Sequence, residues 1–480
     1  MSITDTINSE IGIYNDFFWG IAFVFLIGLG LVFTFKLKGL QILKVHETSR
    51  LAFSGVQEGK GTRKISSFEA FCIGMGARIG VGNIAGVATA IVTGGPGAVF
   101  WMWIFAIIGS ASSFMESTLA QIYKEKKEDG NYYGGPAYYA SKGLGNKSLG
   151  IIAAILLVLT FGIGFVSVQA CNASSALCGA FSFDNNNLVF ALIIAVIAAV
   201  IIFRGLKAAA KFSAAVVPFM AIAWIIFAIV LIALNVSGVA NAFVMIFQYA
   251  FDPQSIAGGA LGTVILTGLK RGVFSNEAGL GSVANVAATA HVNHPCKQGM
   301  IQSFGVLVDT LIVCTITALV VLSYGDFASI TALGVKGANL VQTIAVSTAV
   351  GDAAKYIIAI FMFIFAFTSL IGYYTMSESN ARFIKDNKKV VLVVKIIVIL
   401  VAFFAATVTD ISAMDNLSDT FMALMATVNM VIIVMLSRKV FEAYADYRAQ
   451  KKAGVEDPVF NKDVLSDSTG VTEWDKGREA

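Results

Sequence analysis

Long apolar runs, separated by short polar segments, occupy almost the whole 480-residue chain. A helix needs about 20 residues to cross the hydrocarbon core of a bilayer, and eleven runs come close to or exceed that length. Strict alternation of apolar and polar residues is rare in them, which favours helices over the strands of a membrane barrel. The sequence therefore predicts an all-α integral membrane protein with eleven transmembrane helices. The runs cover approximately residues 16–35, 67–92, 97–123, 150–178, 187–204, 212–235, 256–290, 299–323, 353–376, 390–409 and 416–437.

The composition agrees with this interpretation and narrows the class of protein. Hydrophobic residues make up 57% of the chain and charged residues 13%, and the mean hydropathy of +0.78 lies outside the range of soluble domains. The net charge is only +4, which gives no reason to expect a nucleic acid partner. The five cysteines form no CxxC pair, so we expect neither a disulfide framework nor a metal cluster.

The distribution of Lys and Arg between the runs predicts the orientation in the membrane. Basic residues crowd the segment after the first run and the later segments 124–147, 204–211 and 382–389, whereas 93–97, 179–187, 236–255 and 410–416 have none. Because basic loops stay in the cytoplasm, we expect a multi-pass protein of the inner (cytoplasmic) membrane with its amino terminus outside and its carboxyl terminus inside. No base precedes the first run, so we expect that run to be retained rather than cleaved.

The chain contains a candidate internal repeat. Residues 78–86 (RIGVGNIAG) and 271–279 (RGVFSNEAG) share Arg, Asn, Ala and Gly at the same offsets. The predicted orientation makes the two copies inverted, and five runs begin with each copy. This favours an amino-terminal helix (1–66), two five-helix repeats (67–235 and 236–437) and a tail (438–480), an arrangement in which transporters place their sites on broken helices. Only four of the nine positions match, and two of the matching residues are small. The similarity of the two segments could therefore also be a coincidence.

The first copy has the composition of a broken helix. If Gly80, Val81 and Gly82 are unwound, their free N–H groups can bind a carboxylate, and the next half-helix presents its positive end to the same ligand. Asn83 would help to close this site. Close helix packing is the alternative explanation of the glycines, since G-x-x-x-G spacings occur here. Packing does not explain Asn83 or Arg78, because polar groups at membrane depth are costly and usually functional. In the second copy, the sequence predicts unwinding around Thr267-Gly268 and Gly272.

Polar residues in two other runs are further candidates. Thr368 and Ser369 are adjacent hydroxyls that could complete a sodium shell, although such residues often bond to the preceding helical turn instead. Tyr373, one turn further on, could line a substrate pocket or belong to an interfacial belt. Gln169 could bind a zwitterionic ligand or join two helices. The remaining acids and bases at depth are expected to pair as structural or gating bridges, with partners left open: Arg78, Glu116, Lys270, Arg271, Glu277 and Asp309.

Two polar regions outside the runs give weaker signals. His291, His294 and Cys296 lie close enough in sequence to suggest a metal site, but a loop location makes this a minor alternative. Residues 438–480 mix both charge signs with little apolar periodicity. That pattern predicts a solvated, partly disordered tail.

Several long motifs together resemble one known family. Over about residues 16–450, the chain is similar to the amino acid:cation symporters that carry alanine or glycine with sodium. It implies the LeuT-like fold of the bacterial leucine transporter, in the amino acid/polyamine/organocation superfamily. It also implies uptake of a small neutral amino acid driven by sodium, or in some members by protons, with no cofactor besides the coupling ion. The motifs are GVGNIAGVATAIVTGGPGAVFWMW, ASSFMESTLAQIYK, GGPAYY, KRGVFSNEAGLGS and TAHVNHPCKQG.

The resemblance also implies roles for individual residues. The substrate carboxylate would be held by the broken helix at Gly80, Val81, Gly82 and Asn83. The sodium site shared across the fold would comprise carbonyl oxygens of Gly76, Ile79 and Phe365 with the hydroxyls of Thr368 and Ser369. Three further residues fall where the family contacts its amino acid, namely Gln169, Thr267 and Gly268.

Two departures from the family pattern bear on the substrate. Val81 stands where many members have Thr, which removes a hydroxyl beside the ligand, and Tyr373 stands where alanine carriers commonly have Trp. Alanine or glycine is the first expectation, and glutamine or another neutral amino acid is the alternative. A channel would need polar positions along full spans, and an enzyme would need a metal-ligand helix or a Ser/His pair at depth. The sequence shows neither pattern, whereas a non-transporting amino acid sensor stays open.

Overall fold

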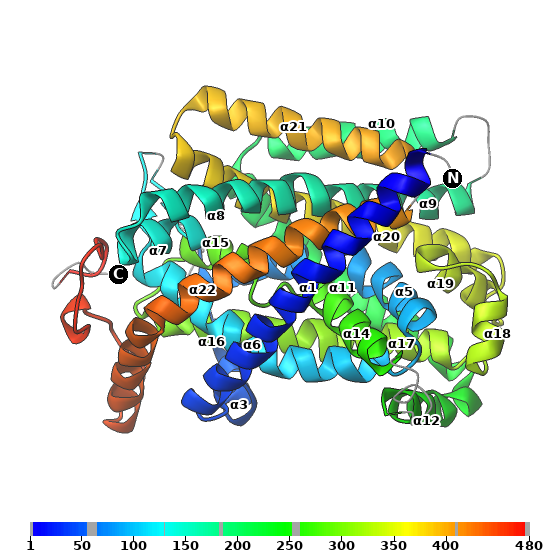
Figure 1. Ribbon diagram of the computed structural model, residues 1–480, viewed down its shortest axis with the longest axis horizontal. Coiled ribbons are helices and arrows are strands. Elements are labelled where there is room, and N and C mark those ends of the chain that lie inside the picture. The colour runs from blue at the N-terminus through cyan, green and yellow to red at the C-terminus, as the bar shows by residue number, and fades with distance from the viewer. Residues whose placement is uncertain are drawn as a thin grey trace.

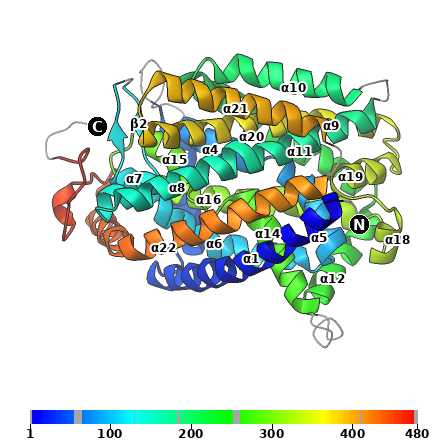
Figure 2. The same cartoon turned by 45° about the horizontal axis from the view of Figure 1, so that its top comes forward.

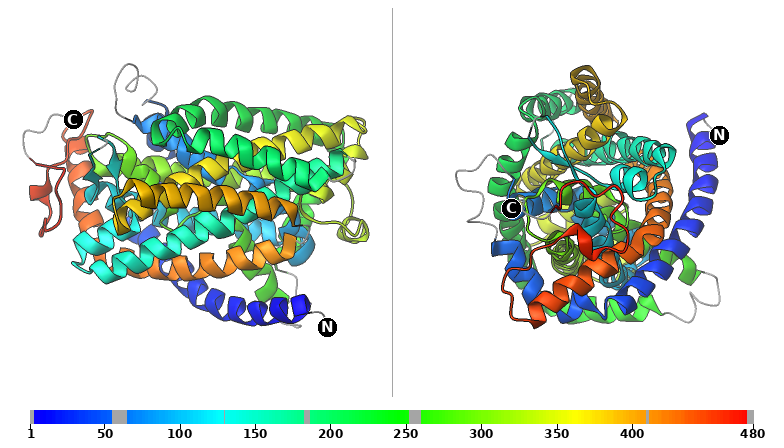
Figure 3. Two further views of the ribbon diagram at one scale, coloured as in Figure 1. Left: turned by 90° about the horizontal axis from the view of Figure 1, so that it is seen from above. Right: turned by 90° about the vertical axis from the view of Figure 1, so that its left-hand side faces the viewer.

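The computed structural model describes residues 3–54, 65–128, 130–181, 186–251, 260–408 and 411–475. In these ranges the protein is a bundle of helices that run roughly along one axis, with the two described chain ends at opposite ends of the bundle (Figure 1, Figure 3). Eight helical segments are long and apolar enough to cross a membrane by length and composition. The protein is therefore a multi-pass membrane protein. The eight segments are 14–36, 98–122, 147–180, 206–233, 295–322, 353–384, 388–407 and 411–452.

As far as the structure describes them, the predicted apolar runs fall on helices or on helices that are locally interrupted; the first residues of the run 256–290 lie outside the described ranges. The uninterrupted ones are α1 (Ile3–Lys36), α6 (Ala98–Ile122), α10 (Asn186–Ile202), α11 (Leu206–Ala233), α20 (Ala353–Ile384), α21 (Lys388–Thr407) and α22 (Ile411–Lys452). Two others contain a π-helical turn: α8 (Lys147–Leu159), η2 (Thr160–Phe165) and α9 (Val166–Ala180), and α16 (Pro295–Leu307), η4 (Val308–Cys314) and α17 (Thr315–Leu322). Such turns often mark functional positions inside helices.

Two runs are broken. The first consists of α4 (Ser67–Arg78), the 3-10 turn η1 (Val81–Asn83) and α5 (Ala85–Gly94). Ser66 begins α4 with a capping box, in which its hydroxyl accepts the Glu69 N–H at 3.1 Å and the Glu69 carboxylate accepts the Ser66 N–H at 2.9 Å. The second consists of α14 (Ala260–Asn276) and α15 (Ser282–Thr289). In membranes, such non-helical backbone is tolerated only inside the protein or beside a cavity.

The two breaks do not lie at equivalent places in the aligned copies. The first interrupts the chain between Arg78 and Ala85, as the sequence predicts, but α14 is continuous through Thr267, Gly268 and Gly272, where unwinding was predicted. The second break instead lies at residues 277–281. There Glu277, Gly279 and Gly281 have φ values of 58°, 83° and 73°, a left-handed conformation that glycine adopts without strain.

The helices pack so that the broken segments lie among the others. α6 runs beside α16, α14 and α15, and α20 packs against α9 and α4. α10 and α21 pair with each other along one outer edge of the bundle (Figure 2), and α1 crosses the outside against α22 and α6 (Figure 1). The residues of both breaks are buried.

Shorter elements lie between the long helices and were not predicted. They are α2 (Leu40–Leu43), α3 (Val45–Ser54), α7 (Pro136–Gly143), α12 (Val239–Ala250), α18 (Phe327–Ala332), α19 (Gly337–Val346) and the 3-10 turns η3 (Val236–Gly238) and η5 (Lys462–Val464). An antiparallel hairpin joins β1 (Glu125–Lys126) to β2 (Tyr132–Tyr133), with Glu125 opposite Tyr133.

The carboxyl-terminal tail differs from the prediction of a partly disordered extension. Helix α22 continues to Lys452, and residues 453–475 fold back onto the end of the bundle. The Phe460 N–H donates to the Asn293 carbonyl at 2.9 Å, and the indole N–H of Trp474 donates to the Gln121 carbonyl at 2.9 Å. Trp474 and Phe460 are both buried. These apolar anchors are few and widely spaced, so a periodicity argument does not detect them.

Candidate functional site

The break after α4 places backbone groups in the middle of the molecule. Ile79 leaves the helical conformation at φ −73° and ψ 83°, and the Gly80 N–H donates to the Asn83 side-chain oxygen at 2.9 Å. A Cβ atom on Gly80 would lie only 2.5 Å from the Ser369 hydroxyl and 2.7 Å from the Gln169 amide nitrogen. Glycine is therefore required here for close approach of the side chains of α20 and α9.

Gln169 and Tyr373 connect three helices at this break. The Gln169 side-chain oxygen accepts the Val81 N–H at 2.9 Å, and its amide nitrogen donates to the Tyr373 hydroxyl at 3.1 Å. That hydroxyl in turn donates to the Ala77 carbonyl at 3.0 Å. The structure thus brings Gln169 from α9 and Tyr373 from α20 to the predicted residues 80–83. This chain of polar contacts fixes the direction of the Val81 N–H, which has no acceptor within the broken helix itself.

The adjacent hydroxyls of Thr368 and Ser369 in α20 face carbonyl oxygens. Ser369 donates to the Gly76 carbonyl at 2.9 Å and to that of Ala77 at 3.2 Å. Thr368 donates to the Phe365 carbonyl at 3.0 Å, within its own helix. All of these side chains are fully buried. Five uncharged oxygens, two of hydroxyls and three of carbonyls, therefore lie in one small region, a donor set that suits a hard monovalent cation.

The second break contributes a polar cluster that is joined to the first. The Asp309 carboxylate of η4 accepts from the Asn83 amide at 2.6 Å and from the Ser275 hydroxyl at 2.7 Å. The Asn276 amide donates to the Thr310 hydroxyl at 3.0 Å. Sequence reasoning noted Asp309 only as a charge at depth and missed Ser275 and Asn276 as site residues. The signal lay in the FSNEAG motif, which places polar residues beside the break.

Aromatic side chains cover the same region. The ring centroid of Phe165 lies 4.6 Å from that of Phe274 and 5.4 Å from that of Tyr373, and Phe161 lies 5.3 Å from Tyr373. Phe274 also approaches Gly82, because a Cβ atom there would lie 3.0 Å from its ring. Phe161, Phe165 and Phe274 were not predicted from the sequence. Phe161 and Phe165 belong to the π-helical turn η2, which single-sequence periodicity does not reveal.

Two predicted substrate residues lie elsewhere. Thr267 contacts Gly94 at the end of α5, and Gly268 packs against the Ala98 carbonyl and Trp101 at the start of α6. Thr267 precedes the end of α14 by nine residues, which is about 13 Å along a helix. The structure does not bring Thr267 and Gly268 to the group around residues 80–83.

The charged residues at depth form separate pairs. Arg271 contacts Asp419 at 2.6 Å and Asp415 at 3.4 Å, so it joins α14 to α22. Lys270 pairs with the exposed Asp16 at 3.3 Å. A small cavity beside residue 81 is lined in part by Arg271, Phe274 and Asp415. The Arg271 pair therefore lies next to the broken helix, on the side of α14 that faces α22.

Arg78 and the two glutamates have mainly uncharged partners. The guanidinium of Arg78 donates to the Asn276 and Gln302 carbonyls at 2.8 and 3.0 Å and to the Ser113 hydroxyl at 3.1 Å. Glu116 accepts from the Gly281 N–H and the Asn429 amide, both at 2.9 Å, and Glu277 accepts from the Ser282 hydroxyl at 2.7 Å. Each of these groups fixes the backbone around the second break.

The histidine segment is structural in this arrangement. His294 precedes α16, and its Nδ1 accepts the Cys296 N–H at 3.2 Å while its Nε2 lies 3.2 Å from the Asp446 carboxylate. Burial lowers the pKa of His294 below its ordinary value of 6.5. Within the described ranges, no three His, Cys, Asp or Glu side chains are grouped so that they could hold a metal ion.

Comparison with known proteins identifies the family. The sodium:alanine symporter family matches residues 4–462. The chain is 45% identical to the "Probable sodium/glutamine symporter GlnT" of Bacillus subtilis, over 97% of this chain and 95% of the relative. It is 36% identical to the "Sodium/alanine symporter AgcS" of Methanococcus maripaludis, over 89% and 94% of the two chains.

A solved structure shares the architecture. The crystal structure of MhsT in complex with L-phenylalanine matches with a TM-score of 0.59 and 13% identity, covering 86% of this chain and 94% of that one. At this identity the likeness concerns the fold alone, which is LeuT-like. The extent of the family match and the identity to these relatives together show that the chain belongs to the sodium:alanine symporter family.

Proposed function

We propose that this chain, a transporter rather than an enzyme, couples the entry of sodium to the uptake of a small neutral amino acid, with alanine or glycine as the substrate. The observation that carries the proposal is the contact of Ser369 with the Gly76 carbonyl at 2.9 Å. It brings the paired hydroxyls of α20 to the free carbonyls before the break in α4. Sodium would be held by the oxygens of Gly76, Ile79, Phe365, Thr368 and Ser369.

The adjacent backbone supplies a site for the amino acid. The N–H groups of Gly80, Val81 and Gly82 lie at the start of a half-helix whose positive end favours a carboxylate. Side chains now satisfy two of these groups, since Asn83 accepts from Gly80 and Gln169 accepts from Val81. A carboxylate that replaces these uncharged acceptors would form stronger, charge-assisted bonds. The rings of Phe165, Phe274 and Tyr373 would surround a short side chain.

Sodium entry supplies enough free energy for accumulation. A neutral zwitterion adds no net charge, so one sodium ion that enters down 100 mV contributes roughly 2.3 kcal/mol. A tenfold sodium gradient contributes about 1.4 kcal/mol more. Together they would sustain an accumulation of several hundredfold.

The proposed topology is that of an alternating-access carrier. It comprises eleven crossings in the inner membrane, with the amino terminus outside, the carboxyl terminus in the cytoplasm, and a five-plus-five inverted repeat after α1. The position of the two chain ends at opposite ends of the bundle supports an odd number of crossings (Figure 3). Arg271, Asp415 and Asp419 would form a gate on the outer side of the substrate, because their pairs join α14 to α22 beside the small cavity at residue 81.

Glutamine is the second candidate substrate. The relative with 45% identity is named as a probable sodium/glutamine symporter. Val81 lacks the hydroxyl of many family members, and Tyr373 has a hydroxyl within 3.1 Å of the Gln169 amide. The Gln169 amide and the Tyr373 hydroxyl could both form hydrogen bonds with the carboxamide of a bound glutamine. A long neutral side chain without a polar group would not use them, which favours glutamine.

Uptake into proteoliposomes tests the proposal. Radiolabelled alanine and glutamine are supplied separately, with an inward sodium gradient, with a proton gradient, and with neither, and are competed by glycine, serine and D-alanine. Accumulation of alanine that requires sodium supports the first proposal, whereas accumulation of glutamine alone supports the second. Uptake driven only by protons would overturn sodium coupling. Single-channel currents would establish a channel, and binding without uptake would establish a sensor.

A further inference from the structure

A basic cavity lies where four helix ends meet, away from the proposed transport site. It has a volume of about 530 Å³ and is lined by the ends of α10 and α20, the starts of α11 and α21, and the β1–β2 hairpin. α10 ends at Ile202, α11 starts at Leu206, α20 ends at Ile384 and α21 starts at Lys388. In a chain that spans a membrane, such helix ends lie near the level of the lipid headgroups.

The charge of this cavity is strongly positive. Arg204, Lys207, Arg382, Lys388 and Lys395 line it, against the single carboxylate of Glu378. Arg382 already pairs with Glu378 at 2.8 Å and with Asp386 at 3.0 Å, and the second oxygen of Glu378 accepts from the Tyr374 hydroxyl. These contacts engage both carboxylate oxygens of Glu378, so this side chain forms no ion pair with the other four bases that line the cavity.

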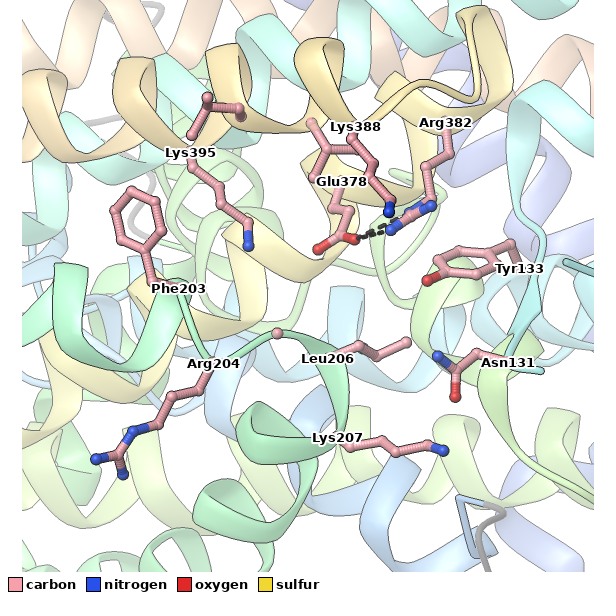
Figure 4. Close-up of a pocket in the computed structure, with 13 residues that line it drawn as sticks. Asn131, Tyr133, Phe203, Arg204, Leu206, Lys207, Glu378, Arg382, Lys388 and Lys395 are labelled. Carbon is pink, nitrogen blue, oxygen red and sulfur yellow. Dashed lines mark hydrogen bonds and ion pairs between the residues drawn. The ribbon is translucent and has the colours of Figure 1, made fainter. Parts of the chain in front are cut away.

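Three of the remaining bases, all lysines, converge on the cavity from α11 and α21. Figure 4 shows Lys388 and Lys395 extending from α21 toward its centre, while Lys207 crosses the opposite side and Arg204 points away from it. Lys395 starts about two turns inside α21 and passes the rings of Phe203 and Tyr374, at 5.5 and 5.7 Å from their centroids. Within the described ranges, none of these four bases forms an ion pair.

Simple snorkelling of bases toward water does not produce this arrangement. Snorkelling side chains extend away from the protein to reach the interface. Three lysines from two helices instead share one concave space, and their combined positive potential there attracts an anion. The geometry therefore indicates an anionic ligand.

Apolar surface continues from the cavity along the outside of the bundle. Phe203 and Leu392 line the cavity and are 53% and 44% exposed. Along α10 and α21, further exposed apolar residues continue at helical spacing away from the cavity, namely Val200, Val196 and Leu192 on α10 and Ile396, Leu400 and Phe404 on α21. A ligand with a negative head and long apolar chains fits both surfaces at once.

We propose that this cavity binds the phosphate-bearing headgroup of an anionic phospholipid, whose acyl chains lie along the exposed apolar faces of α10 and α21. Basic pockets between transmembrane helices are suited to such headgroups. The lysines contact the phosphate, and Asn131 and Tyr133 of the hairpin face the polar glycerol region. A free phosphate ion shares the charge but not the apolar chains. The transported substrate plays no part in this proposal.

Native mass spectrometry of the delipidated, detergent-purified chain tests it. The protein is titrated with phosphatidylglycerol, with zwitterionic phosphatidylcholine of the same chains, and with phosphatidylglycerol in the presence of inorganic phosphate. The triple variant Lys207→Gln, Lys388→Gln, Lys395→Gln removes the converging bases. A matched control, Lys211→Gln, Lys385→Gln, Lys389→Gln, removes three exposed lysines that do not line the cavity.

The wild type is expected to prefer phosphatidylglycerol over phosphatidylcholine. Each base near an anionic headgroup contributes about fivefold to affinity, so the triple variant should bind phosphatidylglycerol roughly a hundredfold more weakly and the control should retain it. Equal weakening in both triple variants, or equal binding of the two lipids, would refute the proposal. Displacement of the lipid by inorganic phosphate at similar concentration would instead show a free-anion site. If the triple variant does not purify folded, the single Lys388→Gln, at an exposed position, gives the same test at about fivefold.

Discussion

The hydroxyl of Ser369 and the carbonyl of Gly76 are joined by a hydrogen bond of 2.9 Å across 293 residues of sequence. The carbonyl belongs to the last turn of α4 before its break, and the hydroxyl belongs to the middle of α20. In the proposed mechanism, sodium would bind the same two oxygens. Any relative movement of α4 and α20 changes their separation, so the ion and the movement are coupled through this contact.

Replacing Ser369 by Ala should weaken the coupling to sodium. The substitution removes one ligand oxygen and leaves the Gly76 carbonyl without its donor, which costs about 1–3 kcal/mol. We expect the sodium concentration for half-maximal uptake to rise at least about fivefold, with a smaller effect on the KM for the amino acid at saturating sodium. Thr375→Ala is the matched control, since that buried hydroxyl of the same helix bonds only to the Ile371 carbonyl. An unchanged sodium response in Ser369→Ala would remove this residue from the proposed ion site.

Replacing Tyr373 by Phe should weaken binding of the amino acid. The hydroxyl accepts from Gln169 and donates to the Ala77 carbonyl, so its loss frees the amide that orients the Val81 N–H. Each such bond contributes about 0.5–1.5 kcal/mol, so the loss of both should raise the KM at least about fivefold in uptake assays. Tyr138→Phe, which removes a buried hydroxyl that bonds to the Ser379 carbonyl, should leave the KM unchanged. Equal effects of the two substitutions would indicate a loss of packing rather than a substrate role.

Replacing Arg271 by Gln should be more damaging alone than in combination. The single change leaves the buried carboxylate of Asp419 and the partly buried one of Asp415 without their partner, and the loss of one partner of a buried ion pair costs about 3–5 kcal/mol. Adding Asp419→Asn removes one of these charges and should recover part of the lost thermal stability in detergent. Lys270→Gln is the control, because its partner Asp16 is exposed and such pairs contribute about 0–1 kcal/mol. A double variant less stable than the single one would contradict this account of the pair.

Acidification should loosen the junction between α16 and α22 through His294. The neutral ring accepts the Cys296 N–H, and its folded-state pKa lies below 6.5. The unfolded chain therefore binds more protons at acidic pH, so this contribution is complete above about pH 6.5 and is lost as the pH falls toward the folded-state pKa. Thermal unfolding followed from about pH 8 to about pH 5 measures the effect. His294→Asn keeps a capping oxygen and should flatten this part of the profile, whereas the exposed His46→Asn should not.

Replacing Trp474 by Ala should release the tail from the end of the bundle. The indole is buried, and its ring contacts Phe460 with centroids 5.4 Å apart while its N–H reaches the Gln121 carbonyl. Truncation of a buried Trp costs about 3–5 kcal/mol, so the attachment of the segment would rest on its smaller buried side chains, chiefly Phe460. Limited trypsin digestion should then cleave after Lys462 much faster than in the wild type. Val464→Ala, at an exposed position of the same segment, should leave the rate unchanged.

The helical architecture could be predicted because lipid imposes a length on each apolar run. The break at Gly80 to Gly82 could also be predicted from the sequence, since glycines and Asn83 interrupt an apolar run at its centre. The second break was misplaced at Thr267-Gly268, because small residues there serve close packing against Ala98 and Trp101. Small residues mark both breaks and helix contacts, and composition alone does not separate the two.

The aromatic side chains over the site and the fold-back of residues 453–475 could not be predicted from the sequence, for different reasons. Phe165 and Phe274 face each other across 109 positions, and each looks like an ordinary apolar residue in its own run. Trp474 is one of a few apolar residues in a polar segment, and its indole N–H donates to the carbonyl of Gln121, which lies 353 residues earlier. Pairings of this kind are set by tertiary packing rather than by local periodicity.

The partners of Arg78 impose an order on the synthesis of this protein. Its guanidinium bonds to the carbonyls of residues 198 and 224 positions later in the chain, so α4 leaves the ribosome long before those acceptors exist. A lone arginine at the centre of a helix costs roughly 2.5–3.5 kcal/mol during insertion. The arginine of the segment before the first break therefore gains these carbonyl partners only after α14 and α16 have been made. The proposed transport site is in this sense completed late, when segments far apart in the sequence come together.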